Sequence, residues 1–453
     1  MSIDRSRLPF VRDEGALHLP RPQRQVLDNG LPVWTVEHEN VPMVSLVLVT
    51  RAGASEDPVD AEGLAALTAD ALDDGAGERD AFALHDAIAS LGASLEIDCG
   101  PDATAIDITT LAATLPEAAH LLADVACRPR FDANEVERVR DLRRQRIAQM
   151  RDVPSAIAER VFVETLFEGH PYGHLSMGRD LALAGLGADD VRGFHRARYG
   201  IDRSLLIVVG EASHAEMRTA AADAFGTMGP SQEPLVRGRI ERMPTSGLAG
   251  TLLLIDRPGA PQSEIRVGRL GPARSTPDYF ASIVMNAALG GQFVSRINLN
   301  LREDKGFTYG VRSGFDFRVG PGAFVVQTSV QTDATAASVR EILRECGDIG
   351  DGRPVTPSEL AMAQAALTRG YPRSFETGDQ IARSCMQAAL YGLPDDYFET
   401  YVARVRAVDV AAVTQAAARW ASPADLFAVV VGDRARVEEE LRGVMPRVVV
   451  TQG

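Results

Sequence analysis

Two apolar segments end in the same way at two distant places in the chain. Ser204 to Gly210 reads SLLIVVG and is followed by Glu-Ala-Ser-His and a helical pattern, and Asp425 to Gly432 reads DLFAVVVG and is followed by Asp-Arg-Ala-Arg and another helical pattern. A short apolar run that is rich in β-branched residues and ends at glycine is typical of a buried strand. The matched strand and helix indicate an internal duplication.

The elements before these two strands repeat in the same order. Asp132-Ala-Asn-Glu opens a long helix in the first part and Thr356-Pro-Ser-Glu opens one in the second, each with an acidic residue in the first turn. Apolar runs at 44–49 and from Ile255 onward predict a strand near the start of each part. A general similarity among α/β proteins would explain one matched strand but not this series. We therefore predict an α+β fold of two duplicated α/β halves, each with a mixed, mostly antiparallel sheet flanked by helices.

A segment rich in proline, glycine and charged residues separates the two parts. It runs from Gly229-Pro-Ser-Gln-Glu-Pro to Pro244-Thr-Ser-Gly and is typical of an exposed linker. We predict an N-terminal domain at 1–232, a linker at 233–247 and a C-terminal domain at 248–453. Two halves joined in this way predict a clamshell around a central cavity.

The composition excludes several functional classes. The 453 residues carry a net charge of -15, which argues against the basic surface that nucleic-acid partners require. The four cysteines are far apart and form no C-x-x-C pair, so they predict neither a disulfide framework nor a structural zinc cluster. No run approaches the roughly 20 apolar residues of a membrane span. As written the chain is predicted to be cytoplasmic, or periplasmic if a signal peptide was removed.

The stretch LGGQFVSRINLNLREDKGFTYG, from Leu289 to Gly310, carries a specific resemblance. It closely resembles the second-half signature of the pitrilysin, insulinase and mitochondrial processing peptidase family, whose fold is a metallopeptidase-like roll. The resemblance implies that Arg302 and Tyr309 reach across the clamshell to a zinc site and hold the bound peptide, where a guanidinium and a phenol can stabilise an oxyanion. Composition alone would favour a helix-end charge for Arg302 and a strand aromatic for Tyr309.

The zinc motif that this family carries in its first half is degenerate here. In H-x-x-E-H, two histidines on one helix face bind zinc and the glutamate activates water. Read in register, Ala66, Ala69 and Asp70 stand at the first histidine, the glutamate and the second histidine. The family's third ligand is a glutamate on a later helix, and Gln145 and Arg146 occupy that neighbourhood. We predict no metal and no complete catalytic set in this chain.

Two other histidines have a spacing that could suit a metal. His170 and His174 are four apart in Gly169-His-Pro-Tyr-Gly-His, but Pro171 and Gly173 are incompatible with a regular helix, so we predict a structural loop. The segment 102–108 lies where active relatives present an edge strand to the substrate. From the residues themselves we predict only the strand.

The resemblance implies a function that depends on a second chain. The family includes pairs in which one subunit carries zinc and the other does not. The leading hypothesis is a non-catalytic subunit that binds peptide, contains no cofactor and supplies Arg302 and Tyr309 to a zinc-bearing H-x-x-E-H partner, with a homodimer possible in isolation. The alternative is a peptide-binding or structural scaffold with no role in proteolysis. An autonomous peptidase would need metal ligands that the sequence does not contain.

Overall fold

The computed structural model describes residues 21–451 apart from 234, 236–239 and 241–246. Most of the predicted linker at 233–247 therefore lies outside the described residues. The first half contains the elements β1 (Gln23–Val26), β2 (Pro32–Glu37), β3 (Met43–Thr50), α1 (Leu64–Asp70), β4 (Gly75–Ala76), β5 (Arg79–Asp80), α2 (Ala81–Ser90), β6 (Ser94–Cys99), β7 (Thr104–Leu111), α3 (Leu115–Cys127), α4 (Ala133–Met150), α5 (Pro154–Leu166), α6 (Asp180–Ala184), α7 (Ala188–Arg198), β8 (Ser204–Gly210) and α8 (His214–Phe225).

The second half follows a similar order of elements. Its motif region contains a short π-helical segment, η4, directly after α10. The elements are β9 (Thr251–Asp256), β10 (Gln262–Gly271), α9 (Tyr279–Leu289), α10 (Arg296–Asn298), η4 (Leu299–Asp304), β11 (Val311–Asp316), β12 (Gly322–Gln331), α11 (Thr335–Gly350), α12 (Pro357–Thr368), α13 (Gly378–Tyr391), α14 (Tyr397–Arg406), α15 (Val410–Trp420), β13 (Phe427–Gly432), α16 (Arg434–Arg442) and β14 (Arg447–Thr451).

The two sheets have the same internal topology. The first has the strand order β6-β7-β3-β8-β2-β1 and the second has the order β11-β12-β10-β13-β9-β14. In both, the first four strands pair antiparallel and the fifth pairs parallel with the fourth. Only the outermost strand differs, since β1 is antiparallel to β2 and β14 is parallel to β9. The predicted fold of two duplicated halves with mixed, mostly antiparallel sheets is confirmed.

Local signals in the sequence set several element boundaries. Helix α12 begins with a capping box in which the Thr356 hydroxyl accepts from the Glu359 N–H and the Glu359 carboxylate accepts from the Thr356 N–H. Strand β8 has the predicted bounds. The predicted start of a strand at Ile255 was wrong. Strand β9 begins four residues earlier, at Thr251, and ends at Asp256, and the next strand, β10, begins at Gln262.

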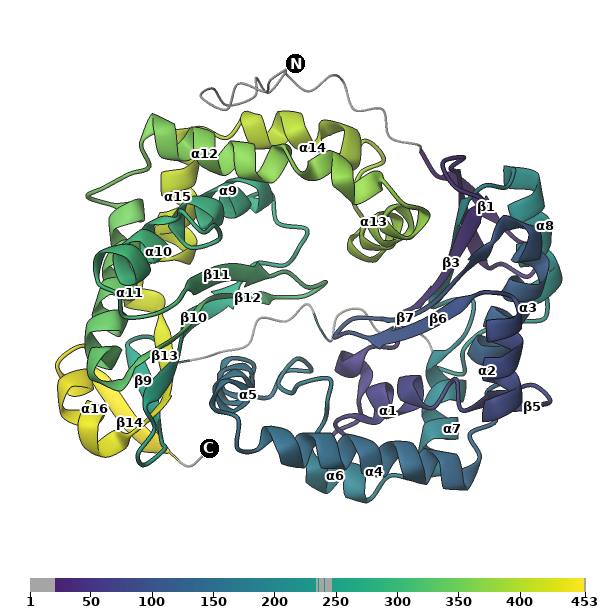
Figure 1. Cartoon of the computed structure of the whole chain (residues 1–453), viewed down its shortest axis with the longest axis horizontal. Helices are drawn as coiled ribbons and strands as arrows, with labels where there is room; N and C mark the ends of the chain where they lie inside the picture. Colours follow the sequence, from purple (N-terminus) through teal and green to yellow (C-terminus); the bar gives the residue numbers. More distant parts are fainter. Residues whose placement is uncertain (1–20, 234, 236–239, 241–246, 452–453) are drawn as a thin grey trace, which may run out of the picture.

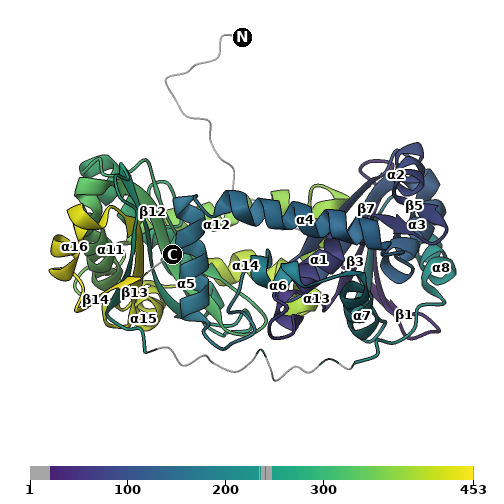
Figure 2. The same cartoon turned by 90° about the horizontal axis from the view of Figure 1, so that it is seen from below.

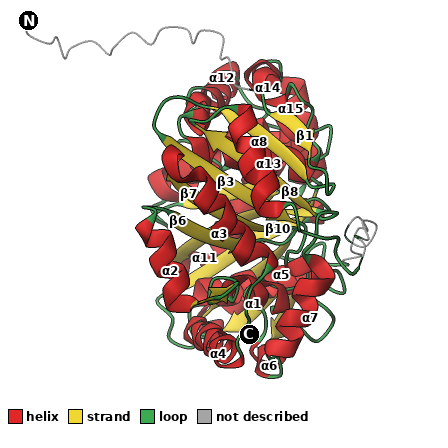
Figure 3. Cartoon of the chain, turned by 90° about the vertical axis from the view of Figure 1, so that its right-hand side faces the viewer, coloured by secondary structure: helices red, strands yellow, loops and turns green. Residues whose placement is uncertain are grey.

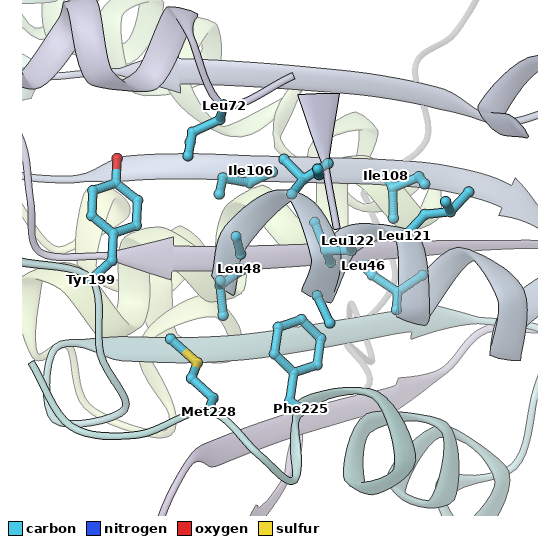
Figure 4. Packing of buried hydrophobic residues seen from close by; sticks show 14 of the residues in the cluster. Leu46, Leu48, Leu72, Ile106, Ile108, Leu121, Leu122, Tyr199, Phe225 and Met228 are labelled. Atoms are coloured by element: carbon cyan, nitrogen blue, oxygen red, sulfur yellow. The ribbon is translucent and has the colours of Figure 1, made fainter. Parts of the chain in front are cut away.

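Each sheet buries its outer face under its own helices. In the first half, Leu46 and Leu48 of β3 and Ile106 of β7 pack against Leu121 and Leu122 of α3 (Figure 4). Figure 3 shows α2, α3 and α8 in front of this sheet. Removal of these leucine and isoleucine side chains from water, at roughly 25 cal/mol per Å² of apolar surface, is the main favourable contribution to each core.

The inner faces of the two sheets are covered by helices of the opposite half. Helix α5 of the first half packs on β10 and β13, where the ring of Phe162 stacks on Phe427 with centroids 4.9 Å apart. Helix α13 of the second half packs on β3 and β8 through Ile381 and Cys385. Both helices lie between the two sheets in Figure 1, and Figure 2 shows α5 beside the second sheet. The reciprocal packing fixes the two halves against each other.

No helix of the described residues combines the length and the apolar character that crossing a bilayer requires.

Candidate functional site

The motif of the second half forms a helical segment, a turn and a strand. Gly306 lies in the turn with φ +65°, a left-handed conformation that glycine adopts without strain. The Asn298 side chain holds the far end of the loop, because its Oδ1 accepts from the Val311 N–H at 2.9 Å and its Nδ2 donates to the Val311 carbonyl at 2.7 Å. These two bonds fix the start of β11 and hold Tyr309 beside η4.

Arg302 and Tyr309 line one cavity of about 610 Å³ on the inner face of the second sheet. The guanidinium of Arg302 lies 3.2 Å from the centre of the Phe293 ring and its Nε donates to Glu303 at 2.9 Å. The Tyr309 side chain is 96% exposed. The same cavity is therefore lined by the Arg302 guanidinium, which is fixed by Phe293 and Glu303, and by the exposed phenol of Tyr309.

Helix α1 begins beside a buried carboxylate, that of Asp57. Asp57 accepts from the Gly63 and Ala65 N–H groups, each at 2.6 Å, and its Oδ2 lies 2.9 Å from His174 Nε2. These bonds satisfy N–H groups that a helix start leaves unpaired. The segment of His170 and His174 forms turns and not a helix. His174 thus supports the entry into α1.

The residues at the degenerate zinc motif do not fit a metal ion. Ala66 and Ala69 are buried on α1, and Asp70 forms an ion pair with Arg143 of α4. The same guanidinium donates to the Ala66 carbonyl at 3.1 Å. One carboxylate, already paired with a cation and flanked by two methyl groups, lacks the three protein ligands that zinc sites use. Within the described ranges, no group of three or more metal-ligating side chains is present.

The sequence places Gln145 and Arg146 in the neighbourhood of the family's third ligand, but a different residue of α4 contacts Asp70. Gln145 and Arg146 are exposed, and Arg143 faces α1 instead. A shift of two residues turns a helix by about 200°, so neighbouring positions point to different surroundings. The spacing from Val136 and Val139, both buried, places Arg143 on the inward face. The helical spacing of Arg143 from these two buried valines is the sequence signal that would have identified it as an inward-facing residue.

The strand predicted at 102–108 exists but does not lie at the sheet edge. It is β7, which pairs with β3 on one side and β6 on the other, so β6 is the edge strand. Asp102 precedes β7 and accepts from the Val319 N–H of the second half at 2.9 Å and from the Tyr172 hydroxyl. Burial raises the pKa of the Asp102 carboxyl. Asp102 therefore joins the two halves.

A second polar contact between the halves involves two carboxyls. Asp107 of β7 is 9% exposed and lies beside Asp379 in the first turn of α13. Burial, together with the negative charge of Asp379, raises the pKa of Asp107 to about 7. Arg383 bonds to Asp379 at 3.0 Å and to Glu96 of β6 at 3.1 Å, which partly offsets the repulsion.

Two protein-family models match this chain. One, described as Insulinase (Peptidase family M16), matches residues 33–179, and the other, described as Peptidase M16 inactive domain, matches residues 185–367. A protein of Mycobacterium leprae named an uncharacterized zinc protease is 27% identical over 353 residues, covering 77% of each chain. The mitochondrial-processing peptidase subunit beta of Lentinula edodes is 24% identical over 276 residues, covering 60% of this chain and 58% of its own.

Solved structures share the fold at low sequence identity. The crystal structure of a peptidase M16 inactive domain from Pseudomonas fluorescens has a TM-score of 0.83 and 24% identity, and covers 91% of this chain and 97% of its own. A protease from Helicobacter pylori also has a TM-score of 0.83, with 16% identity, and covers 91% and 100%. These likenesses extend over both halves.

Proposed function

Because the chain belongs to peptidase family M16, we propose that it is a non-catalytic, zinc-free subunit that completes the active site of a zinc-bearing partner of the same family. The observation that carries the proposal is the contrast between its two halves. At the residues that resemble the family's zinc motif, Asp70 is paired with Arg143, whereas Arg302 and Tyr309 of the second half line an open cavity.

The retained residues suit the binding of a peptide in an extended conformation. A guanidinium stays protonated, and a phenol donates one hydrogen bond, so both can bind carbonyl oxygens and the oxyanion that forms during hydrolysis. Since Tyr309 is almost fully exposed, its hydroxyl is available to a ligand or a second chain. The partner would supply the metal and the water that it activates.

The test is peptidase activity of this chain alone and of its mixture with an H-x-x-E-H family member from the same source. We expect cleavage in the mixture and none from this chain alone. Arg302→Ala and Tyr309→Phe should each lower kcat/KM of the mixture by about 10²-fold, the typical loss for one oxyanion donor. Arg340→Ala is a matched control, because Arg340 is exposed on α11 at the opposite face of the sheet.

Two outcomes would separate the proposal from its alternative. A mixture whose activity equals that of the zinc-bearing chain alone would favour a scaffold with no role in proteolysis. A mixture whose activity survives both substitutions would remove Arg302 and Tyr309 from the active site while leaving the pairing intact.

A further inference from the structure

Arg312 is a second arginine of β11 that faces the inner side of the second sheet. Alternate residues of this strand, Val311 and Phe315, pack in the helix-covered core, so Arg312 points the opposite way. It pairs across the ladder with Gln327 of β12, which pairs in turn with Arg266 of β10. Directly opposite residues of neighbouring strands lie within contact distance. The sheet therefore carries a row of arginine, glutamine and arginine on its inner face.

Among the described residues, Arg312 differs from Arg266 and Arg302, which line the same cavity, in having no counterion. Arg266 pairs with Glu159 and Glu264, and Arg302 pairs with Glu303. Across the part of the chain that the structure describes, Arg312 forms neither a hydrogen bond nor an ion pair. In a chain with a net charge of -15, a cation that no carboxylate neutralises is available to an external anion.

The space beside Arg312 can hold a side chain. A hollow of about 240 Å³ is lined by Arg312, Gly314, Val325 and Gln327. Asp316 also lines it, and its carboxylate is paired with Arg318 at 2.7 Å. Gly314 contributes no side chain, and a Cβ at that position would have no atom within 4 Å. Arg312 and Gln327 also line the 610 Å³ cavity of Tyr309. The hollow therefore adjoins the cavity in which the proposed function places the peptide.

We propose that this hollow is a binding site for an acidic side chain of the bound peptide, with Arg312 as its counterion and Gln327 as a neutral donor. The inference rests on the proposed function only in that the chain binds peptide. A guanidinium binds a carboxylate through paired N–H···O bonds, and the amide of Gln327 can donate to an oxygen that remains. The site thus assigns peptides with an acidic residue at one position as the favoured substrate class and Arg312 as a specificity-determining residue.

The test is direct binding of labelled peptides to the isolated chain, measured by fluorescence anisotropy at low salt. Two sets of fluorescein-labelled alanine-rich peptides would differ only in a single glutamate or glutamine moved through the sequence. We expect the wild-type chain to prefer glutamate over glutamine about fivefold at one position, as a partly exposed charge pair allows. Arg312→Gln should abolish this preference and leave the affinity for the glutamine peptide unchanged. Arg340→Gln, a matched loss of charge on the opposite face, should retain the preference.

A second variant, Arg312→Glu, reverses the charge. It should bind the glutamine peptide more tightly than the glutamate peptide. Equal binding of both sets by the wild-type chain would overturn the inference, as would a preference that survives in Arg312→Gln. A chain that binds no peptide at all overturns it as well. Because the assay contains no partner chain, a glutamate preference that depends on Arg312 would stand even if the partner's activity proved independent of this chain.

Discussion

Replacement of Arg143 by methionine should destabilise the first half although no catalytic group is removed. The Arg143 side chain is 12% exposed. Its guanidinium connects α4 to two other segments, since it donates to Asp70 and the Ala66 carbonyl of α1 and to the Ser176 carbonyl in the loop between α5 and α6. Methionine keeps most of the apolar stem but none of these bonds. Hydrogen bonds to a charged group contribute about 1.5–3 kcal/mol, so we expect Arg143→Met to lower the free energy of unfolding by about 2–3 kcal/mol.

Replacement of Asp70, the other member of the ion pair, should lower the free energy of unfolding by less. The Asp70 side chain is 47% exposed, and Arg143 keeps its carbonyl acceptors when the carboxylate is removed. We expect Asp70→Asn to cost less than about 1 kcal/mol, as exposed ion pairs do. Urea unfolding followed by circular dichroism measures both values. A cost near zero for Arg143→Met, or a larger cost for Asp70→Asn, would refute the view that the arginine stabilises the contact between α4 and α1.

Three further outcomes follow from contacts within the chain. Phe162→Ala should cost about 3 kcal/mol in urea unfolding, because it removes a ring stacked on Phe427 between the halves; an unchanged midpoint would contradict this packing. Asp107→Asn should remove a pH dependence: between about pH 4 and pH 7 folded Asp107 retains a proton that the unfolded chain has lost, so stability falls as pH rises through this window. The variant should be more stable than wild type at pH 8, by up to about 4 kcal/mol, because each unit by which the folded state raises the pKa corresponds to about 1.4 kcal/mol. An unaltered slope in the variant would argue against the carboxyl pair. Tyr309→Phe should leave the thermal midpoint unchanged, since the side chain is 96% exposed, and a large shift would indicate a structural role.

The repeated pattern of strands and helices made the duplication predictable from the sequence. The bounds of β8 and the capping box of α12 follow from residues next to each other in the chain, so local chemistry was sufficient. The exchange of α5 and α13 between the halves was not predictable in this way. An apolar helix face indicates that something covers it but does not identify the sheet that does so.

The role of Arg143 was hard to recognise in the sequence because several arginines lie close together there. Helix α4 carries arginines at several positions, and most of them contact solvent or nearby carboxylates. Only the phase relative to Val136 and Val139 separates Arg143 from its neighbours. The resemblance pointed to Arg302 and Tyr309 directly, whereas the unpaired state of Arg312 depends on which carboxylates the fold brings near.

Zinc content measured on the purified chain tests the central claim most directly. The chain would be incubated with zinc, desalted and analysed by plasma mass spectrometry, with an H-x-x-E-H family member as the positive control. With Ala66, Ala69 and the paired Asp70 at the motif, we predict no zinc above the level of the buffer. One tightly held zinc per chain, together with chelator-sensitive peptide cleavage by this chain alone, would contradict the account.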